Sequence, residues 1–155
     1  MIDLSQRVAL VTGSSRGMGR ACALKLAQAG ADVIVNYVTS RTAAMETAKE
    51  ILDLGRRVHV IKADVSEEDD VRMMLEYVTR EIGQLDIVVS NAATGGFRPL
   101  LAANQRHFQA TFHTNVLALL YLVQASLPLL EKAPAAARLS RLAVMARIWH
   151  CRGTG

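Results

Sequence analysis

The chain has few of the residues that build disulfide frameworks or metal sites. Its 155 residues include two cysteines, Cys22 and Cys151, which have neither metal-ligand spacing nor the pattern of a disulfide framework. We therefore expect free thiols, no metal site, and a reducing compartment such as the cytoplasm. The first five residues show no basic segment followed by an apolar one, so the sequence predicts no secretory signal.

Long hydrophobic runs are also missing. No uninterrupted apolar run approaches the roughly 20 residues that a bilayer-spanning helix needs, so no membrane partner is expected. Hydrophobic residues nevertheless make up 51% of the chain, which is enough for a buried core. The length of 155 residues fits one domain, on a prior of roughly 100–200 residues per domain.

Acidic residues are absent after Glu131, whereas basic residues continue. The net charge is +4, and the basic residues beyond that point are Lys132, Arg138, Arg141, Arg147 and Arg152. A basic tail can indicate nucleic-acid contact. This one has no interleaved aromatic residues and no nucleic-acid-binding motif, so no nucleic-acid partner is expected.

Short apolar segments alternate with helical patterns along the chain. The predicted strands cover residues 8–11, 32–36, 57–62 and 85–89, and the predicted helices cover residues 20–29, 42–54, 66–82 and 105–130. Ser40 is expected to cap the second helix, and Ser66 with Asp69 to begin the third. Apolar strands that are each followed by a helix are typical of a parallel sheet covered on both faces. The sequence therefore predicts a doubly wound α/β sheet, Rossmann-like, with strand order 3-2-1-4 and a poorly formed fifth position.

A glycine-rich turn joins the first predicted strand to the first predicted helix. Residues 12–19 read Thr-Gly-Ser-Ser-Arg-Gly-Met-Gly, which places glycine at positions 13, 17 and 19. Because glycine has no Cβ, the backbone there can turn sharply and approach a ligand closely. The N–H groups and the positive dipole end of the following helix then face bound phosphate. Since ligands of such sheets bind beyond the carboxyl ends of the strands, the turn predicts a dinucleotide site.

Four motifs in this order resemble the short-chain dehydrogenase/reductase family. They are residues 12–19, Asp64-Val65 after the third strand, residues 91–93 after the fourth, and Asn115 in the long helix. The resemblance covers residues 6 to about 132. The segment 91–100 is most similar to the family's NADPH-dependent enoyl-acyl-carrier-protein reductases, with the 3-oxoacyl-acyl-carrier-protein reductases as near neighbours. This resemblance implies an oxidoreductase of fatty acid biosynthesis that acts on acyl thioesters carried by acyl carrier protein. Members of the family are homo-oligomeric.

The choice of cofactor follows from charge. Sites selective for NAD place a carboxylate near the end of the second strand, where it binds the ribose 2′-hydroxyl. This chain has Asn36-Tyr37 there, and it offers Arg16 in the glycine turn and Arg41 after the strand. Guanidinium groups match the 2′-phosphate of NADP(H) with paired donors. We therefore expect NADP(H), although solvated surface is an alternative role for either arginine, above all for Arg41.

The resemblance and the charge argument together define the candidate site. The cofactor-binding candidates are Gly13, Ser15, Arg16, Gly17, Met18, Gly19, Asn36, Arg41, Asp64, Val65, Asn91, Ala92 and Ala93. By resemblance Asp64 accepts from the adenine amino group, or else it only solvates a helix N-terminus. Asn91 ties neighbouring loops together, or else is a plain turn residue. Asn115 is the catalytic candidate, holding a water in a proton relay, with a purely structural role as the alternative.

The family's catalytic tyrosine and lysine are not found in this sequence. None of the three tyrosines has a lysine four residues later, and no lysine follows Lys132. In the family the tyrosine transfers a proton while the lysine lowers its pKa. The alternative function is therefore a catalytically inactive fragment that at most binds NADP(H). His107 and His113 are expected to be surface or satisfied residues rather than catalysts.

The two parts of the chain differ in character. Residues 1–132 are predicted to form the dinucleotide-binding part of a single domain, and residues 133–155 a tail that departs from the family pattern. Arginines stand at 138 and 141, where a buried fifth strand is expected. A truncated chain with a reading-frame change near residues 132–138 accounts for this, because the shifted codons permit a serine–tyrosine segment like the enoyl reductases' catalytic loop. A degenerate strand with a disordered end is the alternative.

Overall fold

The computed structural model describes residues 2–95, 99–132 and 142–144, and within them five strands form one parallel sheet. The strands are β1 (Val8–Val11), β2 (Asp32–Tyr37), β3 (Val58–Lys62), β4 (Ile87–Ser90) and β5 (Leu142–Val144). Their order is β3-β2-β1-β4-β5, and every neighbouring pair is parallel. The predicted parallel sheet and its order 3-2-1-4 are confirmed.

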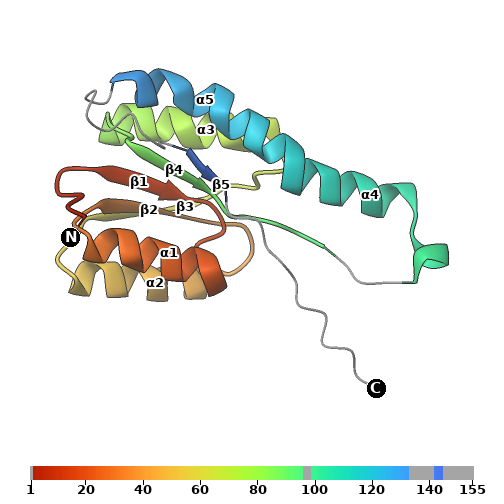
Figure 1. Ribbon diagram of the computed structural model, residues 1–155, viewed down its shortest axis with the longest axis horizontal. Coiled ribbons are helices and arrows are strands. Elements are labelled where there is room, and N and C mark those ends of the chain that lie inside the picture. The colour runs from red at the N-terminus through yellow and green to blue at the C-terminus, as the bar shows by residue number, and fades with distance from the viewer. Residues whose placement is uncertain (1, 96–98, 133–141, 145–155) are drawn as a thin grey trace.

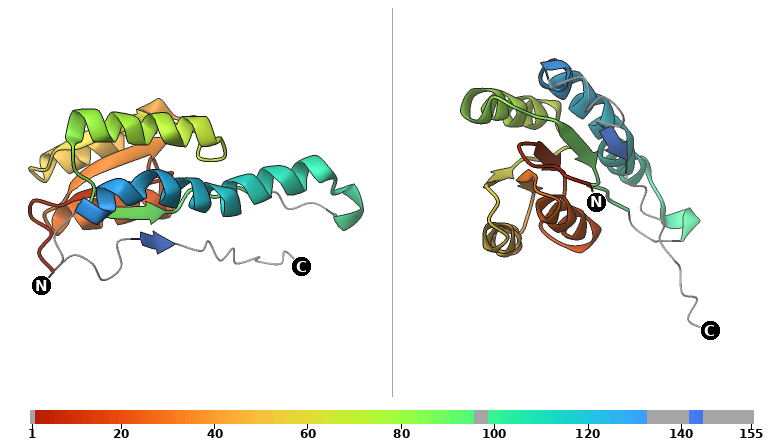
Figure 2. Two further views of the ribbon diagram at one scale, coloured as in Figure 1. Left: turned by 90° about the horizontal axis from the view of Figure 1, so that it is seen from above. Right: turned by 60° about the vertical axis from the view of Figure 1, so that its left-hand side comes forward.

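Helices cover both faces of this sheet. On one face lie α1 (Gly17–Gln28) and α2 (Arg41–Asp53), and on the other lie α3 (Glu68–Tyr77) and α5 (Ala118–Lys132) (Figure 1). The helix α4 (Gln105–Phe112) extends past the carboxyl ends of the strands, as two further views also show (Figure 2). The predicted doubly wound α/β class is therefore confirmed.

The strand register divides the core into two layers. Leu10 pairs with Ile34 on one side and with Val88 on the other, and all three side chains are fully buried against α3 and α5. The next residue, Val11, pairs with Val35 and packs on the opposite face, toward α1 and α2. Because side chains alternate across a strand, continuous apolar sequence supplies both layers at once.

The predicted ends of α2 and α3 have different outcomes. The Ser40 hydroxyl oxygen accepts a hydrogen bond from the Ala43 N–H at 3.3 Å, which confirms the predicted cap of α2. The predicted start of α3 at Ser66 and Asp69 was wrong, because α3 begins at Glu68. The Ser66 hydroxyl instead donates to Oδ1 of Asp64 at 2.7 Å. Ser66 is therefore bonded to the preceding loop and does not cap α3.

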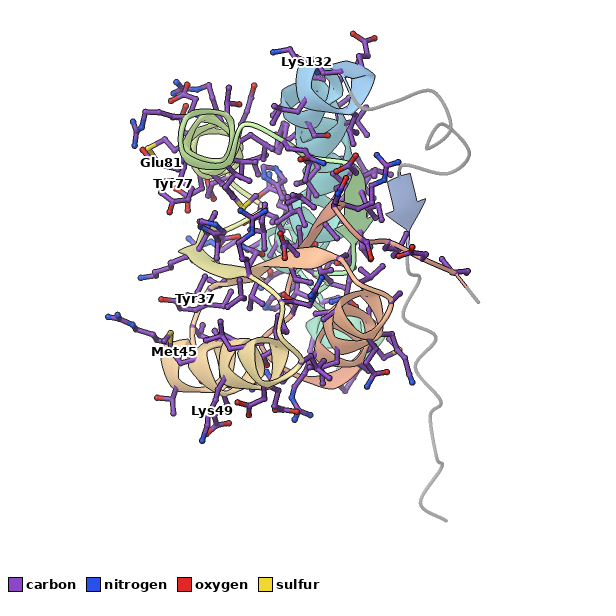
Figure 3. The ribbon with its side chains drawn as sticks, turned by 90° about the vertical axis from the view of Figure 1, so that its left-hand side faces the viewer. Tyr37, Met45, Lys49, Tyr77, Glu81 and Lys132 are labelled. Carbon is purple, nitrogen blue, oxygen red and sulfur yellow. The ribbon has the colours of Figure 1, made fainter. Side chains whose placement is uncertain are left out.

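After α3, a short π-helical segment η1 (Val78–Ile82) leads to Gly83, whose positive φ of 73° ends the helical stretch as predicted. Tyr77 and Glu81 lie at this end of the stretch, on the face of the sheet opposite to Met45 and Lys49 of α2 (Figure 3).

A continuous helical stretch of 28 residues covers Gln105–Lys132, close to the predicted 105–130. It consists of α4, the π-helical segment η3 (His113–Leu117) and α5. By length and composition it is apolar enough to cross a membrane. This was not indicated by the sequence, in which only uninterrupted runs of apolar residues were considered. Four of its residues, Ala118, Leu122, Leu129 and Leu130, are buried in the core of the sheet domain.

The fifth position of the sheet is occupied by a short strand. The three residues of β5 pair with Val88–Ser90 of β4, so part of the β4 edge is covered. The sequence predicted a poorly formed fifth position, and three residues make only a short edge strand. The proposed reading-frame change concerns residues 133–155, which apart from 142–144 lie outside the described residues.

Candidate functional site

A cavity of about 740 Å³ lies at the carboxyl ends of the strands. Four loops and one helix contribute to its wall: the β1–α1, β2–α2, β3–α3 and β4–α4 connections and the α4 helix with its continuation. The lining residues are Gly13, Ser15, Arg16, Tyr37, Val38, Thr39, Asp64, Val65, Ser66, Glu67, Asn91, Ala92, Ala93, Thr94, Gln109, Ala110, His113 and Thr114. The structure thus brings most of the predicted site residues to one place.

The glycine turn forms the floor of this cavity. Gly13 and Gly17 have positive φ angles of 61° and 60°, which a residue with a Cβ adopts only with strain. The hydroxyl of Ser14, fully buried between them, donates to the Val11 carbonyl at 2.7 Å. This hydrogen bond and the two positive φ angles give the turn a conformation that differs from both a strand and a helix.

The start of α1 is open to an anion. Its N-cap residue, Arg16, makes no side-chain capping bond, and the first turn carries no acidic residue. The first N–H groups of a helix have no partner within it, and phosphate is a natural one. The start of α2, by contrast, is already capped by Ser40. The glycine turn therefore fits the diphosphate of a dinucleotide, whereas the neighbouring helix start does not.

Asn36 supports the site from behind and is not part of its wall. This fully buried side chain accepts from the Gly13 N–H at 3.1 Å and donates to the Ala63 carbonyl at 3.0 Å. Its amide thus ties the glycine turn to the loop after β3. The polar atoms of Asn36 are engaged within the protein, and its predicted role in binding the cofactor stays a prediction.

Gly19 and Asn91 lie in close contact beneath the turn. A Cβ built on Gly19 would overlap Nδ2 of Asn91 and the carbonyl oxygen of Gly13. The same Nδ2 donates to the carbonyls of Thr12 at 2.8 Å and Gly13 at 3.2 Å. Asn91 therefore ties two loops together, and the third glycine of the motif is needed for this packing rather than for the cavity wall.

The Thr12 hydroxyl oxygen extends this connection, because it accepts from the N–H groups of Asn91 and Ala92, each at 3.0 Å. Ala92 and Ala93 line the cavity directly. A third contact lies below them, since the Cβ that Gly13 lacks would meet Ala92 at 3.0–3.1 Å. The β4–α4 loop is thus held against the glycine turn at the base of the cavity.

Asp64 and Val65, both predicted to bind the cofactor, line the cavity after β3. Oδ1 of Asp64 accepts from both the N–H and the hydroxyl of Ser66, at 2.9 and 2.7 Å. Its backbone N–H donates to Oδ2 of Asp70 at 2.8 Å, and Val65 is buried beside it. The local bonds hold the carboxyl in place, and Oδ2 of Asp64 remains as an acceptor at the cavity wall.

The two arginines predicted to bind the cofactor occupy different surfaces. Arg16 lines the cavity and is exposed to solvent. Arg41 is the first residue of α2 and lies with Met45 and Lys49 on the outer surface of that helix. Figure 3 shows this surface, with Met45 and Lys49 on α2 and Tyr37 above them. Only Arg16 is placed to meet a group bound in the cavity.

The remaining members of the glycine motif, Gly17 and Met18, stand at the start of α1 outside the lining residues. The Met18 side chain is 39% exposed. Their contribution to a bound phosphate would come from backbone N–H groups.

Asn115 is exposed and makes a paired contact with the β4–α4 loop. Its Oδ1 accepts from the Thr94 N–H at 2.9 Å, and its Nδ2 donates to the Thr94 carbonyl at 2.8 Å. The side-chain amide is thereby used on both sides, in line with the structural alternative. It lies outside the lining residues, although its neighbours His113 and Thr114 belong to them.

Several lining residues were missed by sequence reasoning. Gln109, Ala110, His113 and Thr114 form one face of α4 and its continuation, at the i, i+1, i+4, i+5 spacing of a helix. That spacing was the available signal, but nothing in the sequence indicated which face meets the cavity. His107, in contrast, forms a capping box with Asn104, as expected for a histidine with a structural role.

Comparison with known proteins identifies the family. A family model described as short chain dehydrogenase matches residues 7–138. The chain therefore belongs to the short-chain dehydrogenase family.

Two fungal proteins illustrate the similarity in sequence. The hydroxynaphthalene reductase-like protein Arp2 of Metarhizium robertsii is 38% identical over 122 residues, which are 79% of this chain and 46% of that protein. The hydroxynaphthalene reductase arp2 of Aspergillus fumigatus is 37% identical over 123 residues, 79% of this chain and 45% of that protein. The chain spans about half the length of the curated relatives it matches.

Two solved structures illustrate the similarity in fold. A short chain dehydrogenase from Burkholderia cenocepacia in complex with NADP superimposes with a TM-score of 0.79 at 38% identity, covering 82% of this chain and 52% of that one. The RhlG/NADP active-site complex of Pseudomonas aeruginosa has a TM-score of 0.84 at 31% identity, covering 92% and 55%.

Proposed function

We propose that the cavity binds NADP(H) and that the chain carries the cofactor-binding part of a short-chain dehydrogenase/reductase. The observation that carries the proposal is the uncapped start of α1 above a glycine turn, in a cavity also lined by Asp64, Asn91 and Arg16. These groups supply N–H donors for the diphosphate, a carboxylate for the adenine amino group and a guanidinium for a further phosphate. The related Burkholderia dehydrogenase, described as a complex with NADP, supports this assignment.

The charge pattern around β2 supports NADP(H) over NAD(H). The lining residues at the end of this strand are Tyr37, its last residue, and the following Val38 and Thr39, none of which carries a carboxylate. A carboxylate there would repel the 2′-phosphate of NADP(H), and Arg16 on the adjacent wall would attract it. The 2′-phosphate is therefore assigned to the space between Arg16 and Thr39.

The proposed chemistry is hydride transfer between the nicotinamide and a carbonyl or enoyl group. When bound, the cofactor supplies the hydride, and the protein's part is to hold the nicotinamide against a proton donor. No tyrosine in this chain is followed four residues later by lysine. The second proposal is therefore that the chain, as written, binds NADP(H) without turnover.

Two substrate classes follow from different observations. The resemblance of segment 91–100 to enoyl reductases favours an enoyl- or 3-oxoacyl thioester on acyl carrier protein, in a cytoplasmic homo-oligomer. The names of the fungal relatives favour a hydroxynaphthalene. We retain the acyl thioester as the first proposal, because Ala92, Ala93 and Thr94 of that segment line the cavity.

The test has a binding arm and an activity arm. Calorimetric titration should show NADPH binding more tightly than NADH, and absence of NADPH binding would overturn the proposed function. NADPH oxidation is then followed with crotonyl thioester, acetoacetyl thioester and a hydroxynaphthalene substrate. Binding without oxidation supports the inactive form, whereas turnover at a rate typical of enzymes, about 1–1000 s⁻¹, would reject it and identify the substrate class.

A further inference from the structure

One wall of the cavity is helical and polar. Gln109 and His113 lie one turn apart on α4 and the start of η3, with Ala110 and Thr114 beside them. This wall shares the cavity with Asp64 and the rest of the β3–α3 loop. The two surfaces come from segments more than 40 residues apart in the sequence.

Two of the three polar side chains of this wall, those of Gln109 and His113, have no partner among the described residues. Within the described part of the chain, neither Gln109 nor His113 forms a side-chain hydrogen bond or an ion pair. A carboxamide and a neutral imidazole each offer both a donor and an acceptor. Carboxylates such as Asp64 and Glu67 only accept, so they can satisfy the amino group of a purine but not its ring nitrogens.

The backbone holds this wall in a defined position. The π-helical segment begins at His113, and such segments occur frequently at functional sites because they shift the direction of the following side chains. Two residues later, Asn115 is joined to Thr94 of the β4–α4 loop by two hydrogen bonds. These bonds hold the helix backbone two residues after His113 against the β4–α4 loop, which also lines the cavity.

We propose that His113, together with Gln109, forms a base-recognition wall that contacts the adenine of the bound nucleotide opposite Asp64. The proposal rests on the proposed NADP(H) site and assigns a binding role to Gln109 and to His113, which the sequence alone predicted to be a surface or satisfied residue. Asp64 takes the exocyclic amino group, and the imidazole and carboxamide meet the purine ring and its nitrogen acceptors. The contact is specific to the adenine half of the dinucleotide.

Ligand fragments separate this role from a structural one. Adenosine 2′,5′-bisphosphate carries the adenine half of NADP(H), and nicotinamide mononucleotide carries the other half. His113→Ala should weaken the bisphosphate about fivefold, which is the loss of roughly one net hydrogen bond. His113→Gln should restore part of the affinity, and nicotinamide mononucleotide should bind all variants equally. Val116→Ala, a change at an exposed site on the same π-helical segment outside the lining, is the matched control.

Nuclear magnetic resonance gives a direct readout, because the chain has only four histidines. The ring signal missing from the spectrum of His113→Gln identifies His113, and it should shift on addition of the bisphosphate but not of nicotinamide mononucleotide. Unchanged bisphosphate affinity in His113→Ala, or equal losses for both fragments, would overturn the proposal while leaving NADPH binding intact. A wild-type chain that binds neither NADPH nor the bisphosphate would overturn the proposed function as well.

Discussion

Asn115 and Thr94 are joined by two hydrogen bonds, from the Thr94 N–H to Oδ1 at 2.9 Å and from Nδ2 to the Thr94 carbonyl at 2.8 Å. The side-chain amide pairs with the loop backbone as a neighbouring strand would. It thereby connects the π-helical segment η3 to the β4–α4 loop, whose Ala92 and Ala93 line the cavity. Asn115 thus holds that loop in position, and its predicted catalytic role stays a prediction.

Replacing Asn115 by alanine should free the β4–α4 loop and weaken NADPH binding. Each lost hydrogen bond is worth about 0.5–1.5 kcal/mol, and exposure places the expected cost near the lower end. Asn115→Asp keeps the acceptor for the Thr94 N–H but loses the donor for its carbonyl, so it should lie between wild type and alanine. Hydrogen exchange at the Thr94 amide measures the effect, and unchanged protection in Asn115→Ala would contradict it.

Arg16 and Arg41 form a matched pair for testing cofactor selectivity. Arg16→Ala should reduce the preference for NADPH over NADH by roughly 1.5–3 kcal/mol, the value of a hydrogen bond to a charged group. Arg41→Ala removes the same charge from the outer surface of α2 and should leave the preference nearly unchanged. Calorimetry with both cofactors decides the matter. A larger effect at Arg41 than at Arg16 would move the 2′-phosphate to the α2 start.

Gly19→Ala should destabilise the fold, because the added Cβ overlaps the side chain of Asn91 and the backbone of Gly13. Overpacking of this kind costs about 1–3 kcal/mol. Gly95→Ala is the control, since a Cβ there has nothing within 4 Å. Urea unfolding of the two variants compares them, and equal midpoints would show that the glycine turn can relax around the extra atom.

Cys22 should react slowly with alkylating reagents in the folded protein. It is half-buried on α1 against the core layer, and burial raises the pKa of its thiol. The reactive thiolate is therefore rarer at neutral pH than in the unfolded chain. In a Cys151→Ser background, iodoacetamide modification should be slower than in urea and should increase as the pH rises. Equal rates in buffer and urea would contradict the buried position.

The edge of β4 sets the stability of the C-terminal side of the sheet. Pairing with Leu142–Val144 covers Val88–Ser90, but an edge strand of three residues contributes little. We expect a marginal chain that tends to aggregate, with lower amide protection in β5 than in β1 and β2. Residue-resolved hydrogen exchange tests this. Equal protection in β5 and β1, together with a sharp thermal transition of a monomer, would show that the sheet closes firmly.

The sequence determined the class of fold and the place of the site. Apolar runs that alternate with helical patterns indicated a parallel sheet, because strands buried on both faces need continuous apolar residues. The glycine-rich sequence also predicted the turn at the floor of the cavity, because the positive φ angles of this turn are readily adopted only by glycine. The cap at Ser40 was equally predictable, since its partner lies three residues away. The start of α3 was not, because Asp64 competes for the Ser66 hydroxyl.

Only the tertiary structure decided which of the candidate residues share the cavity. The sequence favoured Arg16 over Arg41 for cofactor binding, and the structure shows that Arg16 lines the cavity whereas Arg41 lies on the outer surface of α2. Asn36 turned out to hold Gly13 from behind the wall.

The wall formed by Gln109 and His113 was likewise invisible in the pattern of α4, since helical spacing shows which residues share a face but not what that face meets. The periodicity of apolar residues along the chain indicates its local secondary structure. The cavity, in contrast, is made by loops that the strand order brings together, and that order places residues distant in sequence against one another.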